Sequence, residues 1–251
     1  MTRTWTLRFG ALPWRIMIER TPLFLLPGLL CDAALWARQV AELSDVADCH
    51  VADMTQDDSI AGMAKRVLDA APERFALAGL SMGGYCAFEI MRMAPERVVR
   101  LALLDTSAEP DTPERTAARR DLVAKAGVGT AGFSAVVERH LQTFVHPDRL
   151  DDAPLMNTIR ASAHNVGAEA YLRQQSAIID RRDQRSSLGD ISCPTLVLVG
   201  RDDALTPLAL HESIAAGISG ARLEVIDDCG HLTTLERPDA VNAALRTWLE
   251  D

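Results

Sequence analysis

The sequence has no hydrophobic run long enough to cross a membrane. Its longest apolar stretch, from Leu23 to Cys31, is interrupted by Pro27 and Gly28 and is far shorter than the roughly 20 residues of a membrane helix. Blocks of like charge are also missing, and the 251 residues carry a formal net charge of −9. This charge argues against nucleic acid or an anionic membrane surface as a partner. We therefore expect neither as a partner, while the oligomeric state stays open.

Cysteine is scarce and is not arranged for cross-linking. The cysteines are odd in number, widely spaced and without a C-x-x-C pair, which argues against a disulfide framework in a chain of this size. We expect a reducing compartment, the cytoplasm, in which these residues pack as small apolar side chains. The five are Cys31, Cys49, Cys86, Cys193 and Cys229.

The first residues lack the features of a secretory signal. They contain Arg3, Arg8 and Arg15 and no acidic residue, but they lack the continuous apolar segment that such a signal has. We therefore expect no signal peptide. Met17 offers an alternative natural start, which would make residues 1–16 a peripheral extension, and the sequence leaves this open.

Motifs for metals and nucleotides are missing as well. The sequence has no H-x-x-H pair and no carboxylate cluster, and neither a Gly-x-Gly-x-x-Gly fingerprint nor a P-loop is present. We expect an activity that needs no metal and no cofactor. Five histidines are interpreted by default as ordinary surface or core residues: His50, His140, His146, His164 and His211.

The sequence does contain an alternation of short apolar runs and amphipathic segments. Continuous apolar runs of this length are typical of strands buried on both faces of a parallel sheet. The runs are Leu23–Leu26, Phe75–Leu80, Val99–Leu104, Thr195–Val199 and Leu223–Ile226. The amphipathic segments are Ala33–Leu43, Ser59–Ala71, Gly84–Met93, Leu208–Ala216 and Pro238–Leu249. We therefore predict an α/β fold with a mostly parallel, doubly wound sheet.

Between about Ser107 and Ile191 the pattern predicts helices only. One helix starts near Pro113 and ends at Gly127, an apolar stripe from Phe133 to Val145 predicts a second, and two more follow from Asp152 and Ala168. We interpret residues 108–190 as a helical cap inserted into a core formed by residues 1–107 and 191–251.

The segment Gly79-Leu80-Ser81-Met82-Gly83-Gly84 follows one predicted strand and precedes a predicted helix. Strand, sharp turn with one serine, and helix is the layout of a nucleophile elbow, G-x-S-x-G. The glycines are needed because a serine with positive φ brings its neighbours too close for a Cβ. The helix that follows directs its backbone N–H groups and the positive end of its dipole toward the same place.

Two further strand ends carry an acid and a base. Gly200-Arg201-Asp202-Asp203 follows one strand, and Asp227-Asp228-Cys229-Gly230-His231 follows the next. Ligands of open parallel sheets bind beyond the carboxyl ends of the strands, so Ser81, an aspartate from 202–203 and His231 are expected to converge. A serine near pH 7 needs such a base, and the base needs an acid to fix its tautomer.

These motifs resemble those of the α/β-hydrolase superfamily, especially its small, capped, cofactor-independent esterase-like members, from about Leu23 to Leu249. The resemblance implies that Ser81 is the nucleophile, Asp203 the acid and His231 the base. Asp202 is the rival for the acid, but Asp203 has the family spacing from Gly200 and to Pro207.

The resemblance also implies an oxyanion hole formed by the backbone N–H groups of Leu29 and Met82. Pro27 stands where the family usually has histidine. This difference does not remove the donor, because the donor is a backbone N–H group. We expect Leu30, together with His164 and Arg173 of the cap, to contact the substrate. The pocket is expected to suit small or medium, mostly apolar acyl groups.

The activity that this resemblance implies is a serine hydrolase cleaving a small or medium ester, or a related acyl bond, through an acyl-enzyme. Its expected partner is therefore a small-molecule substrate. Alternatives with the same fold are an enol-lactonase, to which the loop Leu26–Trp36 is somewhat similar, a C–C bond hydrolase, a thioesterase, and an acyltransferase or perhydrolase. A non-catalytic ligand-binding protein is a further alternative, against which the complete set of motifs argues.

Overall fold

The computed structural model describes residues 20–251, so the expectations about residues 1–16 lie outside it. Its six described strands form one sheet in the order β2-β1-β3-β4-β5-β6, and every neighbouring pair is parallel. They are β1 Thr21–Leu26, β2 Ala47–Val51, β3 Phe75–Leu80, β4 Val98–Leu104, β5 Thr195–Gly200 and β6 Arg222–Ile226. The prediction of a doubly wound parallel sheet is confirmed.

Burial of the strands follows their position in the sheet. Every residue of β3 and β5 is buried, as the continuous apolar runs predict, because these strands have helices on both faces. The edge strand β2 was not predicted. Only Ala47 of β2 is fully buried and exposed Asp48 and His50 interrupt its apolar pattern, so this strand resembles a polar loop in the sequence.

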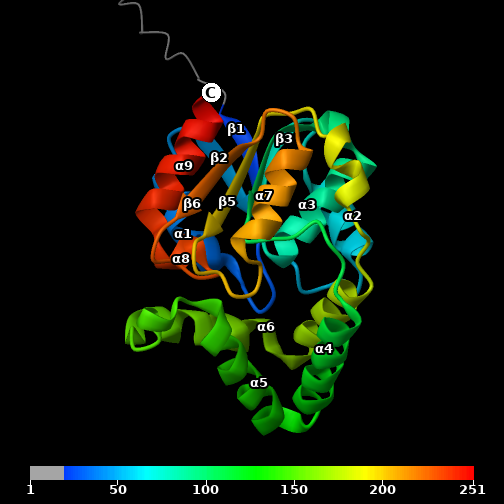
Figure 1. Cartoon of the computed structure of the whole chain (residues 1–251), viewed down its shortest axis with the longest axis vertical. Coiled ribbons are helices and arrows are strands. Elements are labelled where there is room, and N and C mark those ends of the chain that lie inside the picture. Colours follow the sequence, from blue (N-terminus) through cyan, green and yellow to red (C-terminus); the bar gives the residue numbers. More distant parts are fainter. Residues whose placement is uncertain (1–19) are drawn as a thin grey trace, which may run out of the picture.

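Helices cover both faces of the sheet. Helices α1 and α9 pack together on one face, and α2, α3 and α7 cover the other (Figure 1). Helix α3 begins at Met82, with Ser81 alone between it and β3, two residues before the predicted start. The bounds are η1 Ala33–Trp36, α1 Ala37–Glu42, α2 Ile60–Ala70, α3 Met82–Met93, η2 Pro95–Arg97, α7 Leu208–Gly217, α8 Thr233–Glu236 and α9 Pro238–Glu250.

A separate layer of helices follows β4 and precedes β5. It contains α4 Pro113–Ala126, α5 Gly129–Phe144, η3 Pro147–Arg149, α6 Ala153–Ile179 and η4 Arg185–Asp190. Helices α4, α5 and α6 lie beyond one end of the sheet, below it in Figure 1. The two last predicted helices are one element, α6, interrupted at Gly167, where φ is 78° and ψ is 168°.

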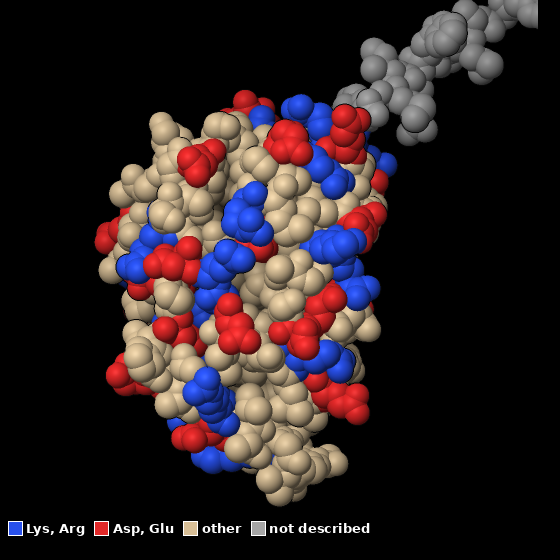
Figure 2. Space-filling model, turned by 90° about the vertical axis from the view of Figure 1, so that its right-hand side faces the viewer, with Lys and Arg blue, Asp and Glu red and all other residues tan. Residues whose placement is uncertain are grey.

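Acidic and basic side chains are interspersed over the face shown in Figure 2, whereas the turn between α4 and α5 has none from Ala126 to Gly132. Within residues 20–251, no helix is long and apolar enough to span a membrane.

Candidate active site

Ser81 occupies the turn between β3 and α3, with φ 56° and ψ −114°. This is the left-handed region that residues with a Cβ rarely adopt, so the surrounding structure must hold it. The Ser81 N–H donates to the Leu104 carbonyl at 2.9 Å, which ties the turn to the end of β4. Gly83 lies against the end of β1, where a Cβ would be 2.0 Å from the Leu26 oxygen.

We expect Gly83→Ala to destabilise the protein by about 1–3 kcal/mol or more, because the added methyl group would force the turn away from β1. Thermal or urea unfolding measures this change. The matched control is Gly189→Ala, since nothing lies within 4 Å of a Cβ at that glycine. Equal stability of the two variants would contradict the close approach of the turn to β1.

His231 lies between Ser81 and Asp203. Its Nε2 is 2.9 Å from Ser81 Oγ, and its Nδ1 is 2.8 Å from Asp203 Oδ2. His231 and Asp203 are each only 3% exposed. An ionised carboxylate can only accept, so Asp203 favours the tautomer with hydrogen on Nδ1. Nε2 is then free to accept the proton of the Ser81 hydroxyl.

Asp203 is held by the start of the segment that follows it. Its Oδ1 accepts hydrogen bonds from the N–H groups of Leu205 and Thr206 at 2.8 and 2.9 Å, and its Oδ2 accepts from the Thr206 hydroxyl at 2.7 Å. Burial alone would raise the pKa of Asp203, but the adjacent His231 and these hydrogen bonds outweigh it and lower the pKa. Asp202 instead has its carboxylate oxygen 3.5 Å from His146 Nε2, with 43% of its side chain exposed.

Two buried carboxylates hold the loop of His231. Glu236 accepts from the N–H groups of His146 and Gly230 at 2.8 and 3.1 Å. Asp105, directly after β4, accepts from the Gly200 N–H at 3.1 Å and from the Thr233 hydroxyl at 2.6 Å.

Asp105 was not among the predicted site residues, although its place directly after a predicted strand could have indicated it. Burial, and then the charge of Asp203, raise its pKa well above the usual range.

The loop after β1 reaches the same place. Leu29 lines the cavity at Ser81, while Met82 is the first residue of α3. Within residues 20–251, neither of their N–H groups donates to a protein acceptor. Helix α6 fixes this loop: Gln174 Oε1 accepts from the Leu30 N–H at 3.1 Å, and Ser162 Oγ accepts from the Asp32 N–H at 2.8 Å.

A cavity of about 60 Å³ lies at Ser81, and we call it the Ser81 cavity. Its lining is more polar than the expected apolar pocket, because α4 and α5 contribute arginine and histidine side chains. It is formed by Leu29, Ser81, Tyr85, Arg115, Arg119, His140, Phe144, Ile178, Leu205, Thr206 and His231.

The other three residues expected to contact substrate lie outside this lining. Leu30 is completely buried in the core with φ 61°. His164 is exposed and packs its ring against Phe133, and the Arg173 Nε donates to the Thr55 carbonyl at 2.9 Å. Of the three, His164 and Arg173 lie on α6 of the helical layer, as predicted. Which of its residues line the cavity depends on how α6 packs.

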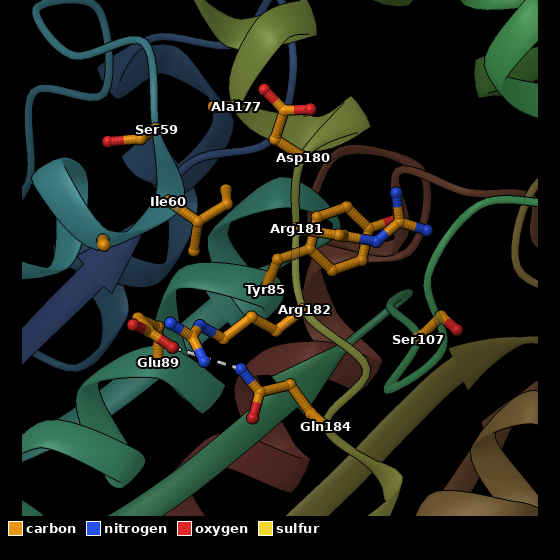
Figure 3. Close-up of a pocket in the computed structure, with 11 residues that line it drawn as sticks. Ser59, Ile60, Tyr85, Glu89, Ser107, Ala177, Asp180, Arg181, Arg182 and Gln184 are labelled. Atoms are coloured by element: carbon orange, nitrogen blue, oxygen red, sulfur yellow. Dashed lines mark hydrogen bonds between the residues drawn. The ribbon is translucent and has the colours of Figure 1, made fainter.

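Tyr85 also lines a second cavity of about 220 Å³, which we call the Tyr85 cavity (Figure 3). In this view Gln184 and Arg182 approach Glu89, and Arg181 lies beside the Tyr85 ring. The Arg181 guanidinium carbon is 4.4 Å from the ring centroid, and the Gln184 amide donates to Glu89 at 3.2 Å.

Groups that could hold a metal, three or more His, Cys, Asp or Glu side chains together, do not occur in the part of the chain that the structure describes. The five cysteines are free, and Cys31, Cys86 and Cys229 are buried. Burial and the charge of Asp32 raise the pKa of Cys31 to about 12, so its thiol is a poor nucleophile near neutral pH.

A parallel sheet between two helical layers, with a serine at the turn after a central strand, defines an α/β hydrolase. A model of the alpha/beta hydrolase fold family matches residues 21–238, and the chain belongs to this family. The resemblance in its motifs is thereby confirmed.

The three relatives described in this paragraph are named as esterases or as an enol-lactonase. The chain is 32% identical to a pimeloyl-[acyl-carrier protein] methyl ester esterase of Aromatoleum aromaticum, over 69% of this chain and 73% of the relative. It is 30% identical to the structure of a thermophilic esterase from Thermogutta terrifontis, with a TM-score of 0.83 over 92% of this chain and 89% of the other. For the enol-lactonase from Burkholderia xenovorans the identity is 26%, with a TM-score of 0.83 over 92% of each chain.

Proposed function

We propose that the protein is a serine hydrolase that cleaves small esters through an acyl-enzyme. The observation that carries this proposal is the hydrogen-bonded series Ser81–His231–Asp203, with distances of 2.9 and 2.8 Å. Ser81 is the nucleophile, His231 the general base and Asp203 the residue that orients it. The esterases among the relatives support the choice of bond.

In the first step Ser81 Oγ attacks the ester carbonyl carbon while His231 Nε2 takes the hydroxyl proton. The carbonyl oxygen becomes an oxyanion, and the N–H groups of Leu29 and Met82 stabilise it. The tetrahedral intermediate collapses, the C–O bond to the alcohol breaks, and His231 returns the proton to the departing oxygen. The acyl group remains on Ser81.

In the second step water replaces the alcohol. His231 takes a proton from water, the resulting hydroxide attacks the acyl carbon, and the same two N–H groups stabilise the second oxyanion. Collapse releases the carboxylic acid and returns the proton to Ser81. Ser81, His231 and the two N–H groups carry out every step, so this mechanism needs neither metal nor cofactor.

Residues 108–190 form the cap in this proposal, because α4, α5 and α6 contribute residues to the wall around Ser81. Both the Ser81 cavity and the Tyr85 cavity are smaller than the roughly 300–1,000 Å³ of drug-sized ligand pockets. Small substrates therefore fit best. Lactones are cyclic esters that the same steps would open, and the enol-lactonase neighbour makes them the second substrate class to test.

The function is tested by labelling and turnover on one preparation. We expect a fluorophosphonate to modify Ser81 alone and to abolish hydrolysis of p-nitrophenyl acetate in proportion to labelling. Peptide mass spectrometry identifies the modified residue. A chelator should leave the rate unchanged, which serves as the control for contaminating metal hydrolases. Labelling of another serine, or turnover that survives complete labelling, would refute the proposal.

A further inference from the structure

The Ser81 cavity adjoins a groove between α4 and α5 that is lined by basic side chains. We call this space, of about 210 Å³, the arginine groove. It is formed by Arg115, Ala118, Arg119, Leu122, Arg139, His140, Thr143 and Leu205. Arg115, Arg119, His140 and Leu205 also line the Ser81 cavity, so the two spaces share a wall.

Asp111 pairs both with Arg119, which lies in this wall, and with Arg181, which lines the Tyr85 cavity. Arg119 Nε pairs with Asp111 at 2.5 Å, and Arg119 Nη1 donates to Gln175 Oε1 at 3.1 Å. Asp111 is almost completely buried and also pairs with Arg181 at 2.9 Å. The two guanidiniums therefore leave one positive charge that no carboxylate balances.

Arg115 and Arg139 add to this excess. Arg115 donates through Nη2 to the Leu205 carbonyl, which carries no formal charge. Within residues 20–251, no carboxylate pairs with Arg115 or Arg139, and no acidic side chain lines the groove or the Ser81 cavity. The groove thus presents guanidinium N–H groups that are available to an anion.

Neutral polar side chains fix the inner part of the groove. His140 Nε2 is 3.1 Å from the Tyr171 hydroxyl, which accepts from Gln175 Nε2 at 2.9 Å. Gln175 in turn accepts from Arg119, so one hydrogen-bonded series holds both lining residues in place. Burial, and then the charges of Arg119 and Arg139, lower the pKa of His140 to about 4, so the positive charge here is that of the arginines.

The Tyr85 cavity does not have such an excess of arginine over acidic side chains. Its lining includes Arg181 and Arg182, but it also includes Glu89 and Asp180. Figure 3 shows Arg182 directed toward Glu89, while Arg181 lies against Tyr85. A cavity with equal numbers of each charge has no preference for an anion, so the arginine groove is the better candidate.

We propose that the arginine groove binds a carboxylate of the substrate, and that the preferred substrates are small esters that also carry a free carboxylate. The planar guanidinium of Arg115 matches a carboxylate in geometry. The chain as a whole has a net charge of −9, so a local excess of arginine is needed to hold an anion beside Ser81. The inference rests on the proposed function, because it takes the ester of the same molecule to react at Ser81.

The test compares monomethyl glutarate, which has a free carboxylate, with dimethyl glutarate, which has none. We expect the parent protein to have the higher kcat/KM for the monoester. Arg115→Gln should lower the monoester-to-diester ratio by roughly ten- to a hundred-fold, as expected for the loss of one charge-assisted hydrogen bond. The change should be in KM, because the carboxylate is bound equally in ground and transition states.

Arg120→Gln is the matched control, because Arg120 is exposed on the same helix and lies outside the groove. The monoester-to-diester ratio of kcat/KM for this variant should equal that of the parent. Arg139→Gln is a second test, at an exposed position where the substitution should leave folding unchanged. It should lower the monoester-to-diester ratio by a smaller factor than Arg115→Gln, because water and salt screen this side chain.

A binding measurement separates this inference from the proposed function. Glutarate should bind Ser81→Ala in calorimetry, more weakly at high salt, and at least roughly ten-fold more weakly when Arg115→Gln is added. Equal rates for both esters without glutarate binding would overturn the inference and leave the ester hydrolase intact. Glutarate binding that depends on Arg115 without hydrolysis of any ester would support the groove and refute the proposed function.

Discussion

Ser81→Ala is expected to lower kcat for ester hydrolysis by on the order of 10⁶-fold while the protein remains folded. The loss is large because the reaction begins with a bond from Ser81 Oγ to carbon, and alanine has no atom that can form it. The fold should persist because, among residues 20–251, this hydroxyl group hydrogen-bonds to His231 alone, at 2.9 Å. The measurement is kcat with p-nitrophenyl acetate, alongside the unfolding temperature.

The matched control is Ser213→Ala, which removes an exposed hydroxyl on α7 far from the turn in sequence. Its rate and stability should equal those of the parent. A rate for Ser81→Ala within ten-fold of the parent would show that another group attacks the substrate. If Ser81→Ala lost activity because it unfolded, that loss would not identify the nucleophile. Fluorophosphonate labelling of the parent protein would then identify it.

The fold could be predicted because its central strands are buried on both faces and therefore have continuous apolar sequences. Strand β2 could not, because an edge strand with exposed Asp48 and His50 has the composition of a loop. The two helices predicted from Asp152 and from Ala168 correspond to the two parts of α6, which non-helical backbone at Gly167 separates.

In the candidate site, too, some residues could be predicted from the sequence and others could not. Ser81, Asp203 and His231 each lie in a short motif at a strand end, where a parallel sheet determines which residues meet. Arg115 and Arg119 lie four residues apart on α4, and this spacing could have indicated in the sequence that they act together. Which helix faces line a cavity depends on side-chain packing between distant segments, so the substrate contacts could not be derived from motifs.

The hydrogen bonds that hold the loop after β1 could not be predicted from the sequence either. Gln174 is completely buried on α6, accepts from the Leu30 N–H and donates to the Met54 carbonyl at 3.1 Å. A buried glutamine that connects two loops has no local signature, because both partners are backbone groups more than a hundred residues away. The position of Leu29 therefore depends on the helical layer as well as on the sheet.

Asp203→Asn is expected to lower kcat by on the order of 10⁴-fold. The N–H groups of Leu205 and Thr206 both donate to Oδ1, so an asparagine would keep its carbonyl oxygen there and turn its NH₂ group toward His231. His231 Nδ1 would then have to accept, and Nε2 would carry the hydrogen. A histidine in that tautomer cannot take the proton of Ser81.

Asp202→Asn is the matched control for this prediction, since it makes the same change one residue earlier. Its side chain is 43% exposed and faces His146 rather than His231, so its kcat should stay within a few-fold of the parent. Both variants should be compared in kcat for a neutral ester, where the arginine groove has no role, and in unfolding temperature. A larger loss in Asp202→Asn than in Asp203→Asn would reassign the acid. Equal and small losses would show that His231 needs no carboxylate to act as the base.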